Sequence, residues 1–294
     1  MSLSRLQERL QSGAFVVTGE IGPPKGTNIE PCLREAEEYL KPKCVAVNVT
    51  DNQSSVMRFG SLATCRLLLE RQIEPVLQMV CRDRNAIALQ SDAISAYGLG
   101  IRNVLAITGD HQSLGDHPQA AGVFDLDSVG LLDALSNLES GKDLAGNQLD
   151  GTPQFFKGAV VSPCVEPIEP QIIKMEKKVR VGAQFFQTQA VFDLHRFARF
   201  MEQVKPLRVP VLAGIILLKS PAMAKFLNEH VAGVRVPEAM ISELASVDKD
   251  KRPEKSVEIA ARLIQELKGL CQGVHIMSLG WERYLPAVLE KAGL

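Results

Sequence analysis

Residues 14–20 read AFVVTGE, an apolar run that ends in a polar side chain, and units of this kind recur along the chain. The runs occupy residues 14–20, 43–50, 74–81, 101–110, 156–162, 183–189, 210–217 and 273–278. They are continuous rather than alternating, which is typical of parallel strands that are covered on both faces. A stretch long enough for a helix separates each run from the next. Eight such units in about 250 residues predict an α/β fold, a (β/α)8 TIM barrel.

The segments between the runs have the apolar spacing of helices. We expect helices over 31–40, 60–71, 84–98, 126–138, 170–180, 194–204, 222–230 and 282–292, with extra helices over 238–246 and 254–268. Helix-start chemistry stands at Asp83 and at Asp127. The amphipathic residues 1–11 predict a further helix at the N-terminus, and two Gly-, Asp- and Asn-rich insertions, 111–124 and 141–154, predict loops. No linker-like composition divides residues 1–294, so we expect a single domain.

Composition and charge exclude several classes of protein. The formal net charge is −1, which offers no electrostatic basis for binding nucleic acid or an anionic membrane. No apolar run approaches the roughly 20 residues that span a bilayer, and the N-terminus does not have the pattern of a secretion signal. The six cysteines form no CxxC pair, so we interpret them as buried thiols of a cytoplasmic protein. The five histidines have no ligand spacing, and no metal site is expected.

Polar residues at the ends of the runs are the candidates for function, because barrel enzymes place their chemistry at the carboxyl ends of the strands. These residues are Glu20, Thr50, Gln78, Asp110 and Gln189.

Glu20 is followed by Gly22-Pro23-Pro24, which turns the chain sharply away. Poor solvation at an apolar strand end favours the protonated form of a carboxyl group, so this side chain can hold a proton near neutral pH. The alternative is a solvated loop glutamate or a helix-capping partner.

Four further residues suggest ligand contacts. Gly109 permits close approach to the backbone, and Asp110 places an anion at the barrel mouth, the alternative being a helix cap. The amide of Gln189 offers a donor and an acceptor to the edge of a heterocycle, the alternative being a surface amide. Lys178 can reach a phosphate, although a solvated helix face is the simpler interpretation of Lys177-Lys178.

Taken together, these segments resemble the methylenetetrahydrofolate reductase family. The matching motifs, in family order, are the strand-one Glu20 with Pro23-Pro24, VNVT at 47–50, TGD at 108–110, KVRVGAQFFQTQAVFD at 178–193, GII at 214–216 and VRVP at 234–237. The resemblance covers the catalytic domain of that family, and its fold agrees with the barrel predicted above.

The resemblance implies a role for each matched residue. Glu20 matches the family's general acid, Asp110 the carboxylate near flavin and folate, and Gln189 the amide at the folate and nicotinamide face. Positions that contact the flavin are matched by Thr50, Gly109, Asp110 and Lys178, and Gln78 occupies a further such position. The implied reaction is the flavin-dependent reduction of 5,10-methylenetetrahydrofolate to 5-methyltetrahydrofolate.

The chain also departs from the well-known bacterial pattern. Where that pattern has a histidine in strand three, this chain has Gln78. Thr108 stands in place of the arginine before Gly109, and Gln171 stands in place of an acidic residue before Lys178. The family's Tyr-Pro pair is replaced by Ser162-Pro163, and its terminal TLNR motif is replaced by SLGW at 278–281. Several of these family positions serve the adenosine-diphosphate half of FAD, so both FAD and FMN remain candidates.

The electron donor and the partners stay open at this point. The resemblance allows either NAD(P)H or a reduced partner protein, such as the cysteine-rich, zinc-binding subunit that some relatives use, and we expect an oligomer. Two alternatives to the reductase are a flavin-free pterin-binding barrel, such as a methyltetrahydrofolate methyltransferase, and a non-catalytic barrel subunit of a complex.

Overall fold

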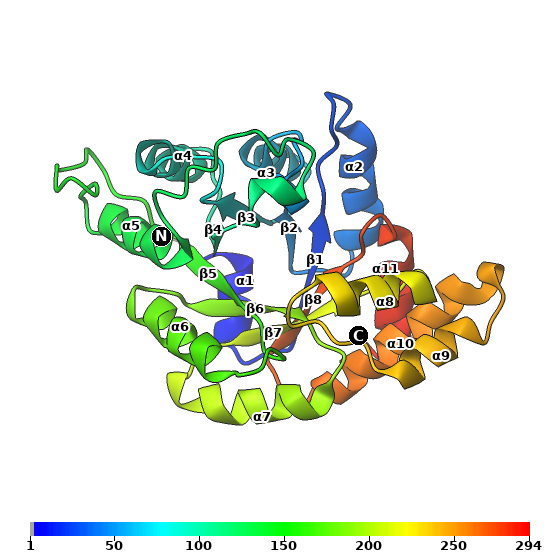
Figure 1. Ribbon diagram of the computed structural model, residues 1–294. Helices are drawn as coiled ribbons and strands as arrows, with labels where there is room; N and C mark the ends of the chain where they lie inside the picture. Colours follow the sequence, from blue (N-terminus) through cyan, green and yellow to red (C-terminus); the bar gives the residue numbers. More distant parts are fainter. Residues whose placement is uncertain (1–2) are drawn as a thin grey trace.

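Eight parallel strands close into a barrel in the computed structural model, which describes residues 3–294. Their order around the barrel follows the sequence, and β8 pairs with β1 to complete the ring (Figure 1). The strands are β1 (Val16–Ile21), β2 (Ala46–Val49), β3 (Pro75–Val80), β4 (Asn103–Ile107), β5 (Phe156–Val161), β6 (Phe185–Ala190), β7 (Val211–Ile216) and β8 (Gly273–Met277). The predicted TIM barrel in a single domain is confirmed.

Helices surround this barrel, and at least one follows each strand (Figure 1). They are α1 (Arg5–Gln11), α2 (Glu30–Glu35), α3 (Ser61–Glu70), α4 (Ala86–Gly98), α5 (Ser128–Glu139), α6 (Glu169–Arg180), α7 (Leu194–Val204), α8 (Pro221–His230), α9 (Glu238–Ala245), α10 (Arg252–Leu267) and α11 (Leu285–Lys291). The expected helices over 238–246 and 254–268 correspond to α9 and α10. No helix within residues 3–294 is long and apolar enough to cross a bilayer.

Local details differ from the predictions in three places. The helix expected over 31–40 is α only as far as Glu35, and it continues as a π turn over Ala36–Leu40 in which the Lys41 N–H bonds to the Ala36 carbonyl. Asn85, not Asp83, caps α4, because the Asp83 carboxylate is engaged by Arg82. The helix expected from residue 282 begins with a 3₁₀ turn, and α11 starts only at Leu285.

Helix α1 closes the amino-terminal end of the barrel, where it lies behind the strands in Figure 1. The side chain of Ser4 caps it, and the Glu74 carboxylate accepts the N–H groups of Arg5 and Leu6, which have no partner within the helix. Leu6 and Leu10, four residues apart, both turn inward. The predicted N-terminal helix is therefore the plug of the barrel.

Inside the barrel, the side chains are apolar at the amino-terminal end and polar further up. The apolar layer packs around Leu6 and consists of Leu10, Val16, Ala46, Val76, Leu105, Phe156, Phe185 and Leu212. Two residues further along the strands, the buried residues Thr18, Asn48, Gln78, Gln187 and His275 follow. This polar layer lies directly beneath the carboxyl ends of the strands, where the candidate residues stand.

Candidate active site

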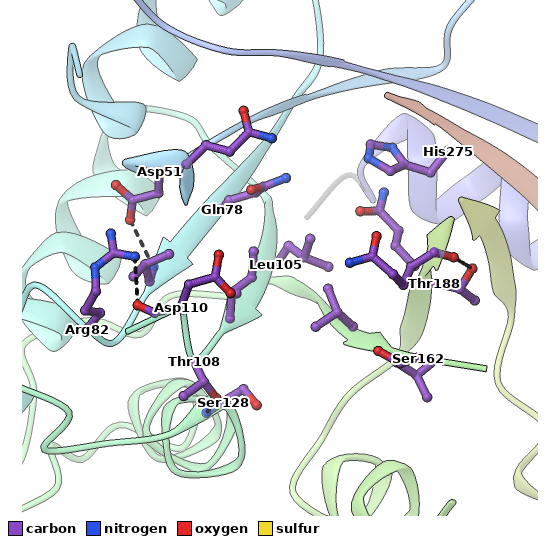
Figure 2. A pocket seen from close by; sticks show the side chains of 18 of the residues that line it. Asp51, Gln78, Arg82, Leu105, Thr108, Asp110, Ser128, Ser162, Thr188 and His275 are labelled. Carbon is purple, nitrogen blue, oxygen red and sulfur yellow. Dashed lines mark hydrogen bonds between the residues drawn. The ribbon is translucent and has the colours of Figure 1, made fainter. Parts of the chain in front are cut away.

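A cavity of about 440 Å³ opens at the carboxyl ends of the strands. Figure 2 shows Asp51, Arg82 and Asp110 on one side of it and Thr188 and His275 on the other. The predicted site residues that line this cavity are Glu20, Gln78, Gly109, Asp110, Lys178 and Gln189. They come from five different strands or their following segments and meet only because the barrel closes. The volume is typical of a site for a small organic ligand.

Glu20 is the penultimate residue of β1 and is only 8% exposed. Its Oε2 accepts a hydrogen bond from Gln78 Nε2 at 3.0 Å and lies 3.4 Å from His275 Nε2. The other oxygen, Oε1, makes no hydrogen bond within the described residues 3–294. One oxygen is thus held in place, while the other has no protein partner in this part of the chain. A second cavity, of about 520 Å³, adjoins the first at Glu20.

Glu20 stands at the end of a buried hydrogen-bonded chain that the sequence analysis missed. His275 Nδ1 lies 3.0 Å from Thr18 Oγ1, so the imidazole bridges Thr18 and Glu20. Gln187 Nε2 donates to Thr18 at 3.4 Å and exchanges hydrogen bonds with Asn48 at 2.7 and 3.1 Å. The available signal was an inward-facing polar residue at the same level of four different strands, which strand periodicity alone does not single out.

Gly109 and Asp110 lie in the loop after β4 rather than in the strand, because β4 ends at Ile107. Gly109 has φ +93°, and a Cβ there would lie 2.7 Å from Val80 Cγ1, so glycine is required by the backbone and by β3 whether or not a ligand is bound. The Asp110 carboxylate is exposed at the rim and has no hydrogen-bond or ion-pair partner among residues 3–294. It is an uncompensated anion at the mouth.

Lys178 is the second charged group of the site, and its position contradicts the solvated-face interpretation. It is 4% exposed and donates from Nζ to the Val160 carbonyl at 2.7 Å, whereas Lys177 is exposed. Burial, together with the charge of nearby Lys174, lowers the pKa of Lys178 to about 8. Lys174 and Gln171 line the same cavity from the same helix. A buried ammonium with a lowered pKa is suited to bind an anion.

Two of the predicted residues, Thr50 and Gln189, are less well placed to contact a ligand in the cavity. Thr50 does not line the main cavity: it is 2% exposed, and its buried hydroxyl has no hydrogen-bond partner among the described residues. Gln189 lines the cavity, but its Oε1 accepts a hydrogen bond from the N–H of Ala190 at 3.1 Å, which leaves its amide NH₂ for a ligand.

A charged cluster after β2 and β3 forms part of the wall, and the sequence analysis missed it as well. Asp51 accepts the N–H of Val80 and pairs with Arg84, while burial raises the pKa of its carboxyl group. Arg82 is buried against the loop that carries Asp110 (Figure 2). The signal was present in the sequence as CRDR at 81–84, directly after an apolar strand.

The cysteines are confirmed as unpaired thiols, five of them buried and Cys32 half-buried. Burial raises the pKa of Cys44 and of Cys81 to about 12. Within residues 3–294, no group of three or more His, Cys, Asp or Glu side chains is placed to hold a metal ion.

Comparison with known proteins shows which family the sequence of this chain matches. A family model described as methylenetetrahydrofolate reductase matches residues 5–293. The 5,10-methylenetetrahydrofolate reductase of Pectobacterium carotovorum is 25% identical over 263 residues, which cover 87% of this chain and 80% of that protein. Methylenetetrahydrofolate reductase 2 of Schizosaccharomyces pombe is 21% identical across the whole chain, which spans 48% of that longer protein.

The fold also recurs among solved structures. A protein from Clostridium thermocellum, described as binding two copies of 5-methyl-5,6,7,8-tetrahydrofolic acid, superimposes with a TM-score of 0.63 at 14% identity. The match covers 98% of this chain and 97% of that one. At this identity the likeness shows the barrel fold.

Proposed function

Because the chain belongs to the methylenetetrahydrofolate reductase family, we propose that it reduces 5,10-methylenetetrahydrofolate to 5-methyltetrahydrofolate with a bound flavin. The observation that carries this proposal is the meeting of Glu20, Asp110 and Lys178 around one cavity at the barrel mouth. An acid, an exposed anion and a buried cation together match the needs of this reaction.

The residues that line the cavity support a bound flavin. Leu105, Ile107, Val160 and Met277 offer apolar walls for a planar ring system. Lys178, with Lys174 beside it, would hold a phosphate of either FMN or FAD. When bound and reduced, the flavin supplies the hydride.

Glu20 supplies the proton that the substrate needs. The methylene group of the substrate bridges two nitrogens in a five-membered ring, and opening that ring requires protonation of the departing amine. Glu20 donates this proton, the C–N bond breaks, and the methylene carbon becomes the iminium carbon that accepts the hydride. The hydrogen bond from Gln78 and the contact with His275 fix the carboxyl group during the transfer.

His275 keeps Glu20 oriented and connected to the polar interior. Its two ring nitrogens face Thr18 and Glu20, so a proton on either nitrogen has an oxygen acceptor.

Asp110 and Gln189 act on the folate ring. The cationic iminium formed by ring opening is stabilised by the Asp110 carboxylate, which pairs with no cation among residues 3–294. The amide NH₂ of Gln189 is free to contact the ring edge. The Clostridium thermocellum protein that binds 5-methyltetrahydrofolic acid supports a folate in a barrel of this shape.

The visible spectrum of the purified chain, followed by the mass of whatever denaturation releases, tests the flavin. A yellow protein that releases FMN or FAD supports the reductase and identifies the cofactor. A colourless protein that takes up neither flavin contradicts it and favours a flavin-free pterin barrel. Bleaching of the flavin by NADH or NADPH under anaerobic conditions identifies a nicotinamide donor; otherwise the donor is a reduced partner protein.

Glu20→Gln tests the acid. The substitution keeps the shape of the side chain but removes its proton, so turnover should fall by about 10²–10⁴-fold while the flavin remains bound. Steady-state turnover and flavin content are measured together. Glu70→Gln, a change of an exposed carboxyl group on α3, is the matched control. Unchanged turnover in Glu20→Gln would remove Glu20 from the mechanism.

A further inference from the structure

Arg82 is a buried cation in the cavity wall that the mechanism above does not use. It follows β3 and is 2% exposed. Its guanidinium donates two hydrogen bonds to the Asp83 carboxylate, of 2.7 Å from Nε and 2.8 Å from Nη2. A buried arginine in this fork geometry is rigid, because both the packing and the paired bonds restrict it.

The same guanidinium reaches the loops on both sides of its own. Nη1 donates to the backbone carbonyl of Asp110 at 3.2 Å, a contact drawn in Figure 2, and Nη2 donates to the carbonyl of Asn52 at 3.1 Å. The Arg82 carbonyl accepts the N–H of Val123, which lies further along the Asp110 loop. One side chain thus joins the segments that follow β2, β3 and β4.

The segment after β2, which Arg82 contacts at Asn52, has an unusual backbone conformation. Asn52, Ser54 and Ser55 all have positive φ, at 45°, 57° and 59°, a conformation that is uncommon for residues other than glycine and costs most at the two serines. Asn52 also donates from Nδ2 to Asp83 at 3.1 Å. The Asp110 loop packs on this strained segment, because a Cβ at Gly115 would lie 1.8 Å from the Ser55 carbonyl oxygen.

The ion pair between Arg82 and Asp83 persists at neutral pH. Burial by itself raises the pKa of Asp83, but the hydrogen bonds from Arg82 and Asn52 outweigh it and hold that pKa below its usual value. The fork therefore stays ionised. Arg82 contacts Asp110, in contrast, only at its backbone carbonyl, so the Asp110 carboxylate has no hydrogen-bond or ion-pair partner among residues 3–294.

We infer that Arg82 is a positioning residue that sets the place of the Asp110 carboxylate at the cavity mouth by holding the backbone of Asp110 to the strained segment after β2. This inference rests on the proposed role of Asp110 toward the folate. It assigns Arg82 no contact with the reacting atoms.

A double-mutant cycle tests it. Arg82→Met, Asp110→Asn and the double variant are compared for the Kd of 5-methyltetrahydrofolate and for kcat and KM in the purified flavin-loaded protein. Loss of one charge-assisted hydrogen bond corresponds to about a tenfold loss of affinity, which is expected for Arg82→Met. If Arg82 acts through Asp110, the double variant binds as weakly as Asp110→Asn alone, not more weakly.

Two further variants control for stability. Arg82→Lys keeps the charge but not the fork, and should lose affinity much as Arg82→Met does, provided that melting shows it to be folded. Arg84→Met breaks the ion pairs with Asp51 and Asp92 without any contact to Asp110, so its effect should add to that of Asp110→Asn.

Each outcome decides the question. Additive losses in the Arg82 cycle, or wild-type affinity in both folded Arg82 variants, would overturn the inference while the role of Asp110 stands. Wild-type affinity and turnover in Asp110→Asn would instead remove Asp110 from the proposed function, and the positioning role of Arg82 with it. The Glu20→Gln result is independent of both.

Discussion

At the scale of single residues, the two buried ionisable side chains Glu20 and Lys178 line the same cavity but have different surroundings. Glu20 is held through one oxygen by Gln78 and His275, which leaves the other oxygen free. Lys178 has one backbone acceptor, the Val160 carbonyl, and a lysine neighbour that repels its charge. The first arrangement suits proton transfer, and the second suits the binding of an anion.

The lowered pKa of Lys178 predicts how flavin binding depends on pH. In the ligand-free protein this ammonium loses its charge as the pH rises through about 8, whereas a bound phosphate favours the charged form. The affinity for FMN should therefore be highest below pH 8 and fall by up to about tenfold per pH unit above it. The measurement is the Kd of FMN between pH 7 and pH 9, from quenching of its fluorescence.

Riboflavin, which lacks the phosphate, is the control ligand and should show no such fall. Lys178→Met should bind FMN weakly and without the same pH dependence. Equal pH slopes for FMN and riboflavin in the wild-type chain would show that Lys178 does not hold the phosphate.

At the scale of elements, four strands of the barrel, β1, β2, β3 and β6, contribute to both the apolar and the polar layer. Phe156 of β5 and Phe185 of β6 stack at 4.7 Å in the apolar layer above α1. Gly158 of β5 leaves the space that the Phe185 ring fills, since a Cβ at Gly158 would lie 2.2 Å from its Cζ. Two residues beyond Phe185, the same strand contributes Gln187 to the polar layer. The register of the strands thus determines both which side chains fill the amino-terminal end of the barrel and which polar side chains lie in the layer above it.

Gly158→Ala should accordingly destabilise the protein. A methyl group forced against a buried aromatic ring costs about 1–3 kcal/mol of the free energy of unfolding. Gly98→Ala is the matched control: this exposed glycine at the end of α4 has no neighbour within 4 Å, and alanine favours a helix. Urea unfolding of both variants measures the difference. Equal midpoints would show that the β5–β6 contact relaxes without cost.

At the scale of the whole molecule, stability and chemistry lie at opposite ends of the barrel. The amino-terminal end holds the apolar layer and its plug α1, and the carboxyl end holds the cavity. The polar layer around His275 and Gln187 lies between them. This separation allows the loops at the mouth to differ from those of relatives while the base stays packed.

Leu6→Ala tests the separation. Leu6 is fully buried in the base, so the substitution should lower the free energy of unfolding by about 2–5 kcal/mol. The Kd of the flavin should remain unchanged, because α1 does not reach the cavity. Leu3→Ala, at a side chain that is 46% exposed, is the control and should change neither quantity. A loss of flavin affinity in folded Leu6→Ala would show that the two ends are coupled.

The sequence by itself was sufficient to predict the order and type of the elements. Continuous apolar runs alternating with helical spacing admit few architectures other than a parallel barrel, and the carboxyl ends of its strands are where Glu20, Gln78 and Asp110 were expected. Element ends were predicted less well: β4 stops at Ile107, and α4 is capped by Asn85. Those ends depend on contacts with other segments, such as the fork between Arg82 and Asp83.

Only the tertiary structure decided which polar side chains are buried together. Thr18 and His275 are 257 positions apart, and they meet because β8 closes against β1. The residues alone favoured a solvated helix face for Lys178, whereas the family resemblance implied a flavin contact; in the structure the side chain is buried and bonds to the Val160 carbonyl. Both faces of a parallel strand are apolar in a sequence, so the pattern does not reveal which polar residue points into the barrel. Closure of the sheet supplies the missing partners, and with them the hydrogen bonds that make burial of polar groups tolerable.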